Sequence, residues 1–284
     1  MLLYTGVGDA YGLGFEFCSK EHIEKNNDVL DYKKREKESK GWKSHFLGQY
    51  SDDTDCSLAV VTTLLSMDGM FDVKYFLISW KGWLTKNPER GYSKLTKEQL
   101  LNLSDQEIIN SERNSVSNGC LMGAHFLGLL PSQEKFAKAC VAKCLPMHAN
   151  PECIVATTFV AYLAHNLYYK TADLQEAIKM IKMKHDFLAS DKKVECNAIS
   201  TVNGILYALE GKSKIDVLKR SIEIGGDTDS VASIALGLHS LNAKEGDLLP
   251  KNFYAKLELP NNYISTESIY ESFWKRLKNK FPRN

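Results

Sequence analysis

The hydrophobic positions of the chain recur mostly every three or four residues, which is the spacing of an amphipathic α-helix. The clearest stripe begins after Asp72 and consists of Phe76, Leu77, Trp80 and Leu84. Similar stripes occupy residues 174–181, 199–209 and 269–281, and Asp173 is the expected N-cap of the first of them. Alternation of apolar and polar residues is nearly absent, with residues 44–50 as the single short candidate for extended structure. The pattern predicts an all-α protein.

Two uncharged segments are long enough to be considered as membrane spans. Residues 153–169 fall short of the ~20 apolar residues that a membrane helix needs, so we expect a buried helix there. Residues 114–133 contain Asn118, several glycines and Pro131, which is typical of a loop that leads into a short helix. The first residues lack the basic and apolar regions of a secretory signal. We therefore expect a cytoplasmic protein without a membrane anchor.

The chain offers no linker or repeat that would divide its 284 residues. We expect one domain spanning residues 1–284, and a monomer. Two polar stretches, residues 33–40 and 86–113, are interpreted as surface insertions, most simply as solvated loops. A contact with another macromolecule is the alternative interpretation of both stretches.

Composition narrows the function mainly by exclusion. The 36 Lys and Arg residues nearly balance 35 Asp and Glu residues, and a net charge of +1 offers no excess of basic residues for nucleic acid at the level of the whole chain. The seven cysteines are scattered and odd in number, so we expect reduced thiols rather than a disulfide framework. Cys140 and Cys144 have the spacing of one helix face and are expected to belong to the core.

Three carboxylates open one of the predicted helices. Asp52, Asp53 and Asp55 follow Ser51 and precede an apolar stripe at residues 58–65, so they fall at the N-cap and in the first turn. An acidic side chain there interacts favourably with the helix dipole by about 0.3–1 kcal/mol. One cap needs only one acceptor, however, and neighbouring carboxylates repel each other. A bound cation would relieve that repulsion.

A second cluster of the same design lies far along the chain. Gly225 and Gly226 precede Asp227, Asp229 and Ser230, which open another predicted helix. Each of the two helix starts thus presents carboxylates and a hydroxyl, an oxygen-only set that suits hard divalent cations such as Mg²⁺ or Mn²⁺. Either cluster alone is explained by capping, whereas the two together predict a metal site.

A third acidic pair lies near the N-terminus. Asp9 stands among glycines, and Glu16 follows seven positions later. Seven residues make about two helical turns, so the two acids would share a face of a helix, and the glycines would allow backbone or a ligand to approach closely. The alternative interpretations are an N-cap for Asp9 and a partly exposed acid without a role for Glu16.

The three clusters together, in order and spacing, resemble the signatures of the ADP-ribosylglycohydrolases, which include the dinitrogenase-reductase-activating glycohydrolases. The chain has GDAYGLGFEF where the family has GDALGxxxEF, YSDDTD where it has TDDT, and GGDTDSVASIALG where it has GGDTDTxAAIxG. It also has SNGCLMGAHFLGLLP for NGxxMRxxPLGLL and LPMHANPECIVAT for LTHxxPxxxxAA. The resemblance extends from about Gly6 to Leu241.

This resemblance implies an all-helical hydrolase with two divalent cations, Mg²⁺ or Mn²⁺, at the base of a cleft for ADP-ribose. The metal ligands that it implies are Ser51, Asp52, Asp53, Asp227, Asp229 and Ser230. Glu16 falls on the acidic position near the scissile ribose, and either Glu16 or Asp53 would take the proton of the attacking water. The implied substrate-binding residues are Asn118, Gly119, His148, Gly225 and Gly226. The substrate would be an ADP-ribosylated protein or a related conjugate, with the N–H groups of the helix starts near the diphosphate.

Departures from the family pattern leave other functions open. Gly123 stands where many relatives have Arg, and Ser51 and Ser230 occupy positions that are commonly Thr. A catalytically inactive member that binds ADP-ribose, or a structural one such as the lens crystallins of this family, would be marked by lost ligands, yet all six positions keep an oxygen. A third class, an interaction protein that uses the basic region Lys33–Lys43, would leave the aspartates unexplained.

Overall fold

The computed structural model describes residues 1–35, 45–182, 190–258 and 266–282, and within these ranges the chain is built from helices. The helical segments are α1 (Leu2–Leu13), α2 (Lys20–Asn26), α3 (Asp52–Ser66), α4 (Val73–Lys86), α5 (Lys94–Asn102), α6 (Asp105–Ile109), the 3₁₀ turn η1 (Asn118–Cys120), α7 (Ala124–Leu127), α8 (Gln133–Cys144), α9 (Pro151–Tyr169), α10 (Leu174–Lys182), α11 (Ala198–Ala208), α12 (Lys214–Glu223), α13 (Thr228–His239), α14 (Lys251–Lys256) and α15 (Thr266–Lys280). Extended pairing within these ranges is limited to two isolated bridges. The all-α prediction is confirmed.

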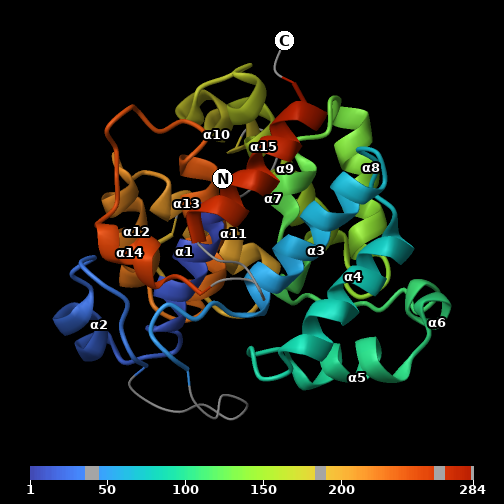
Figure 1. Ribbon diagram of the computed structural model, residues 1–284, viewed down its shortest axis with the longest axis horizontal. Helices are drawn as coiled ribbons and strands as arrows, with labels where there is room; N and C mark the ends of the chain where they lie inside the picture. The colour runs from blue at the N-terminus through green and yellow to red at the C-terminus, as the bar shows by residue number, and fades with distance from the viewer. Residues whose placement is uncertain (36–44, 183–189, 259–265, 283–284) are drawn as a thin grey trace.

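Helices α1 and α13 pack closely against each other in the middle of the molecule, with α3 and α4 to one side and α12 to the other (Figure 1). The close approach depends on glycine. A Cβ atom on Gly8 would lie 2.2 Å from the carbonyl oxygen of Ala232, and one on Gly12 would lie 2.4 Å from the Cα of Asp229. The hydroxyl of Thr228 donates to the carbonyl of Gly12 at 2.8 Å. This packing places the start of α13 beside the end of α1.

Most of the predicted helices have the expected ends. Asp72 caps α4 by accepting the N–H of Tyr75, and Asp173 accepts the N–H of Glu176 at the start of α10. The stripe at residues 199–209 corresponds to α11, and the closing stripe corresponds to α15. Periodicity identified these elements because each has one buried face and one solvated face.

The uncharged segment 153–169 is the buried helix α9 rather than a membrane span. No helix among the described residues is long and apolar enough to cross a membrane. All seven cysteines are free thiols, and Cys140 and Cys144 are both buried on α8, as expected.

Two predictions about irregular segments need correction. Residues 45–50 form a turn with Gly48 at φ +88°, instead of an extended segment, while Ser44 lies outside the described residues. Residues 86–113 are not simply a solvated loop, because they contain α5 and α6 with Leu100 and Ile108 buried. Two apolar anchors in two short helices are too few to produce a visible stripe. Of the other stretch, residues 36–40 lie outside the described part of the chain.

Candidate functional site

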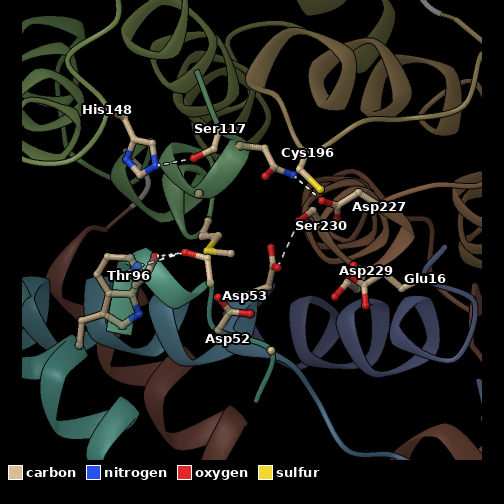
Figure 2. A pocket seen from close by; sticks show the side chains of 16 residues that line it. Glu16, Asp52, Asp53, Thr96, Ser117, His148, Cys196, Asp227, Asp229 and Ser230 are labelled. Carbon is tan, nitrogen blue, oxygen red and sulfur yellow. Dashed lines mark hydrogen bonds between the residues drawn. The ribbon is translucent and has the colours of Figure 1, made fainter. Parts of the chain in front are cut away.

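The acidic clusters and the 117–119 turn meet at one cleft of about 170 Å³ (Figure 2). Carboxylates from the first turn of α3, from the start of α13 and from the turn after α1 form one part of its wall. The lining residues are Glu16, Asp52, Asp53, Trp80, Gly91, Ser93, Thr96, Ser117, Asn118, Gly119, Met122, His148, Cys196, Asp227, Asp229 and Ser230. Segments far apart in the sequence thus build a single site.

Asp9 supports the site from beneath instead of capping its own helix. It is fully buried inside α1, and its Oδ1 accepts the N–H of Ser51 at 2.8 Å. Its Oδ2 accepts the N–H of Thr54 at 2.9 Å and the Thr54 hydroxyl at 2.5 Å. The N-cap interpretation of Asp9 is wrong because α1 begins at Leu2, well before Asp9. The carboxylate fixes the start of α3 relative to α1.

Replacing Thr54 by Val tests this support. The change removes the hydroxyl that donates to Asp9 and alters the shape of the side chain little. The buried carboxylate of Asp9 then loses one of its hydrogen-bond donors. We expect the free energy of unfolding to fall by about 1–2 kcal/mol, as measured by urea denaturation. Thr54→Ser retains the hydroxyl and is the matched control; equal stability of the Val and Ser variants would contradict the assigned role.

The amide groups at the start of α3 are already occupied. The N–H groups of Ser51 and Thr54 donate to Asp9, as described above. The N–H of Asp52 donates to the carbonyl of Arg90 at 2.9 Å, and that of Asp53 donates to the Ser51 hydroxyl at 3.2 Å. The expectation that this helix start offers N–H groups to a diphosphate is therefore wrong. Ser51 is the N-cap, so its hydroxyl is directed toward the N–H groups of the first turn of α3.

The two aspartate clusters are joined directly. The hydroxyl of Ser230 donates to Oδ2 of Asp53 at 3.1 Å. Asp227 is the N-cap position of α13 but forms no side-chain capping bond. Instead, its Oδ2 accepts the amide N–H of Asn118 at 3.0 Å, so the cap residue faces the cleft. Asn118, which the sequence placed in a ligand-binding loop, thus also holds one of the predicted metal ligands.

Glu16 lies beyond the end of α1, so it does not share a helix face with Asp9. It still reaches the cleft and lies beside Asp229 (Figure 2). Its Oε2 is 2.9 Å from Nη2 of Arg35. Burial raises the pKa of Glu16 to about 7, while the charge of Arg35 acts in the opposite direction. Arg35 belongs to the stretch predicted as a solvated insertion, and its buried ion pair corrects that prediction for this residue.

The aspartates of the cleft lie close together, and the surrounding residues do not neutralise their negative charge. Burial, and after it repulsion between neighbouring carboxylates, raises the pKa of Asp52, Asp53 and Asp229 well above the usual range. Oδ1 of Asp53 and Oδ1 of Asp229 are buried without a hydrogen-bond partner in the described part of the chain. A buried carboxylate oxygen without a partner is costly. The donor set therefore fits a hard divalent cation.

The arrangement is not a closed coordination sphere. Over the described ranges, no three acidic, histidine or cysteine side chains are grouped so that they could hold one metal ion as they stand. The ligand set Ser51, Asp52, Asp53, Asp227, Asp229 and Ser230 therefore remains a prediction. Of its members, Ser51 does not line the cleft, and neither do the predicted substrate-binding residues Gly225 and Gly226.

Gly225 and Gly226 shape the turn before α13. Both have positive φ, +67° and +85°. A Cβ atom on Gly226 would lie 1.9 Å from the carbonyl oxygen of Val194, and the N–H of Asp227 donates to that same carbonyl. The two glycines therefore let the chain pass beside Val194 and set the position of Asp227.

Asp55, the third acid of the first cluster, does not line the cleft. Its Oδ2 accepts the Tyr92 hydroxyl at 2.8 Å and lies 3.6 Å from Nε of Arg90. The same guanidinium donates to both carboxylate oxygens of Glu258 at 2.6 Å. This buried network ties α3 to the segment after α14, so Asp55 has a structural partner within the protein.

The opposite wall of the cleft is formed by uncharged side chains, among them His148, and by the turn at residues 117–119. Nε2 of His148 is 3.0 Å from the Ser117 hydroxyl, and burial lowers the pKa of His148 to about 3, so the ring is neutral. A Cβ atom on Gly119 would lie 3.1 Å from Nε2 of His148. His148 and Gly119, both predicted from the sequence, thus lie together in this wall.

Gly123 has a structural reason to be glycine. Its φ is +72°, and a Cβ atom there would lie 3.0 Å from the Cα of Ser57. The ammonium of Lys143 donates to the carbonyl of Cys120 at 2.7 Å and to that of Gly119 at 3.5 Å. A buried lysine therefore supplies positive charge next to the turn.

The sequence does not predict several of the residues that line the cleft. Gly91, Ser93 and Thr96 come from the segment predicted to be a surface insertion, and Trp80 belongs to the apolar stripe of α4. Cys196 carries no recognisable motif, yet its thiol lies beside Asp227 (Figure 2). Ser117 directly precedes Asn118 and Gly119, and that adjacency was the one available signal.

Comparisons with known proteins give a family from the sequence and a similar fold from a solved structure. The family model described as ADP-ribosylglycohydrolase matches residues 1–281. A solved structure named "ADP-ribosylglycohydrolase-related protein complex" is similar in fold, with a TM-score of 0.67 and 19% sequence identity over 98% of this chain and 95% of the other. No curated protein matches the sequence significantly. At this identity the structural likeness concerns the fold alone.

Proposed function

Because the chain belongs to the ADP-ribosylglycohydrolase family, we propose that it is a metal-dependent hydrolase. It cleaves the glycosidic bond between ADP-ribose and a modified protein side chain or a related conjugate. The observation that carries this proposal is the convergence of Glu16, both aspartate pairs and the 117–119 turn on one cleft. A capping role alone would not require the carboxylates of two distant helix starts to face the same cavity.

The metal part of the proposal rests on the donor chemistry of the cleft. Two divalent cations, Mg²⁺ or Mn²⁺, would be held by Ser51, Asp52 and Asp53 from the start of α3 and by Asp227, Asp229 and Ser230 from the start of α13. The unpaired buried oxygens of Asp53 and Asp229 support this assignment. Such cations supply charge neutralisation and Lewis-acid polarisation at the ribose.

The residues of the chain have separate parts in the reaction. Cleavage at the anomeric carbon passes through an oxocarbenium-like transition state, which nearby carboxylates stabilise. Glu16 or Asp53 takes the proton of the attacking water, and both lie at the cleft. Asn118 holds Asp227 in place, and the 117–119 turn with neutral His148 binds the remainder of the ADP-ribose.

The experiment that tests the function combines turnover with binding. A panel of ADP-ribosylated peptides and small conjugates is incubated with the protein in Mg²⁺ or Mn²⁺, and released ADP-ribose is quantified. We expect release from at least one conjugate. Calorimetric titration with ADP-ribose is the second arm: binding without turnover of any conjugate would favour the inactive ADP-ribose-binding alternative, and neither binding nor turnover would contradict the proposal.

A further inference from the structure

Arg35 contacts Glu16 at two points. Its Nη2 lies 2.9 Å from Oε2 of the Glu16 carboxylate and donates to the Glu16 backbone carbonyl at 3.1 Å. The side chains of Arg35 and Glu16 are only 4% and 16% exposed. A planar guanidinium that contacts both the carboxylate and the main chain of one residue fixes the direction in which that carboxylate points.

The charge of Arg35 matters because of what surrounds Glu16. The other carboxylates that line the cleft are Asp52, Asp53, Asp227 and Asp229, and all four are proposed metal ligands. Glu16 is the lining carboxylate outside this proposed ligand set, so we assign to it the contact with the group attached to the ribose. One of its oxygens already faces a guanidinium.

We propose that Arg35 is a positioning residue for Glu16 and that its charge makes the cleft prefer neutral, oxygen-linked acceptors over guanidinium-linked ones. This inference rests on the proposed function and deepens it. An arginine acceptor would bring a second guanidinium to a carboxylate that is already paired, and juxtaposed like charges disfavour binding. A hydroxyl-linked acceptor, such as a modified serine, brings no charge and meets a carboxylate held in a fixed orientation.

The test compares two peptides of the same length, one ADP-ribosylated on serine and one on arginine. We expect the wild type to have the higher kcat/KM on the serine-linked peptide. Arg35→Met and Arg35→Gln remove the charge, so kcat on the serine-linked peptide should fall and the preference ratio should shrink at least about tenfold. Arg35→Lys keeps the charge and should keep the preference with a smaller loss of kcat. Lys33→Met removes a nearby cation paired with Asp28 and should behave as the wild type.

Several outcomes would overturn the inference. A wild type that prefers the arginine-linked peptide contradicts it without any variant. An unchanged preference ratio in Arg35→Gln or Arg35→Met, with thermal unfolding like that of the wild type, would reduce Arg35 to a structural residue and leave the proposed function intact. A wild type that cleaves neither these peptides nor any other conjugate would overturn the proposed function, and this inference with it.

Discussion

Replacing Asp227 by Asn is expected to lower kcat/KM for ADP-ribose release by at least about 10³-fold. The substitution keeps the shape of the side chain and an oxygen that can accept the Asn118 N–H seen at 3.0 Å. It removes a negative charge from the proposed metal ligands, so binding of the divalent cation and stabilisation of the transition state should both suffer. Initial rates on a cleaved conjugate, together with calorimetric titration of Mn²⁺, measure the two effects.

Asp191→Asn provides the control, because Asp191 is exposed and outside the cleft. It removes the same charge from the chain and should leave both the rate and Mn²⁺ affinity unchanged. Thermal unfolding of both variants should resemble that of the wild type. If Asp227→Asn retained turnover within tenfold of the wild type, Asp227 would not be a metal ligand.

The largest stability effect is expected from Gly8→Ala, which should lower the free energy of unfolding by about 3 kcal/mol or more. The added methyl group would meet the carbonyl oxygen of Ala232 at 2.2 Å, so α1 and α13 must separate. That separation also moves Asp9 and Asp229, and activity should fall with stability. Urea denaturation measures the change.

Gly82→Ala is the matched comparison for that experiment. Gly82 lies in the interior of α4 with no atom within 4 Å of an added Cβ, so alanine should stabilise the helix by about 0.5–1 kcal/mol. Opposite signs for the two substitutions would follow from the packing of α1 on α13. Equal effects would show that helix propensity alone decides at Gly8.

The sequence predicted the helices with strong stripes and both aspartate-bearing helix starts, because periodicity and capping are local. The stripe after Asp72 became α4 with the expected cap, and Asp52 and Asp53 fall in the first turn of α3. The short helices α5 and α6 were not predicted, because their burial depends on packing against α4 and not on a repeated apolar pattern.

The sequence predicted many of the residues of the candidate site, but it did not predict most of the contacts between them. One cleft is lined by residues that the sequence resemblance had placed in the site, namely Glu16, Asp53, Asp227 and His148. The role of Asp9 as an acceptor for α3 could not be predicted, because a helix start can be held by a carboxylate from any segment that tertiary packing brings close. The same holds for Arg35, whose partner Glu16 is distant in the sequence and whose surrounding residues are mostly charged.

Metal-dependent hydrolysis at this cleft is tested most directly by the rate of ADP-ribose release from a cleaved conjugate before and after chelation. We predict that treatment with EDTA abolishes release by the wild type and that an excess of Mg²⁺ or Mn²⁺ restores it. A rate that is unchanged in EDTA would contradict the proposed metal-dependent mechanism.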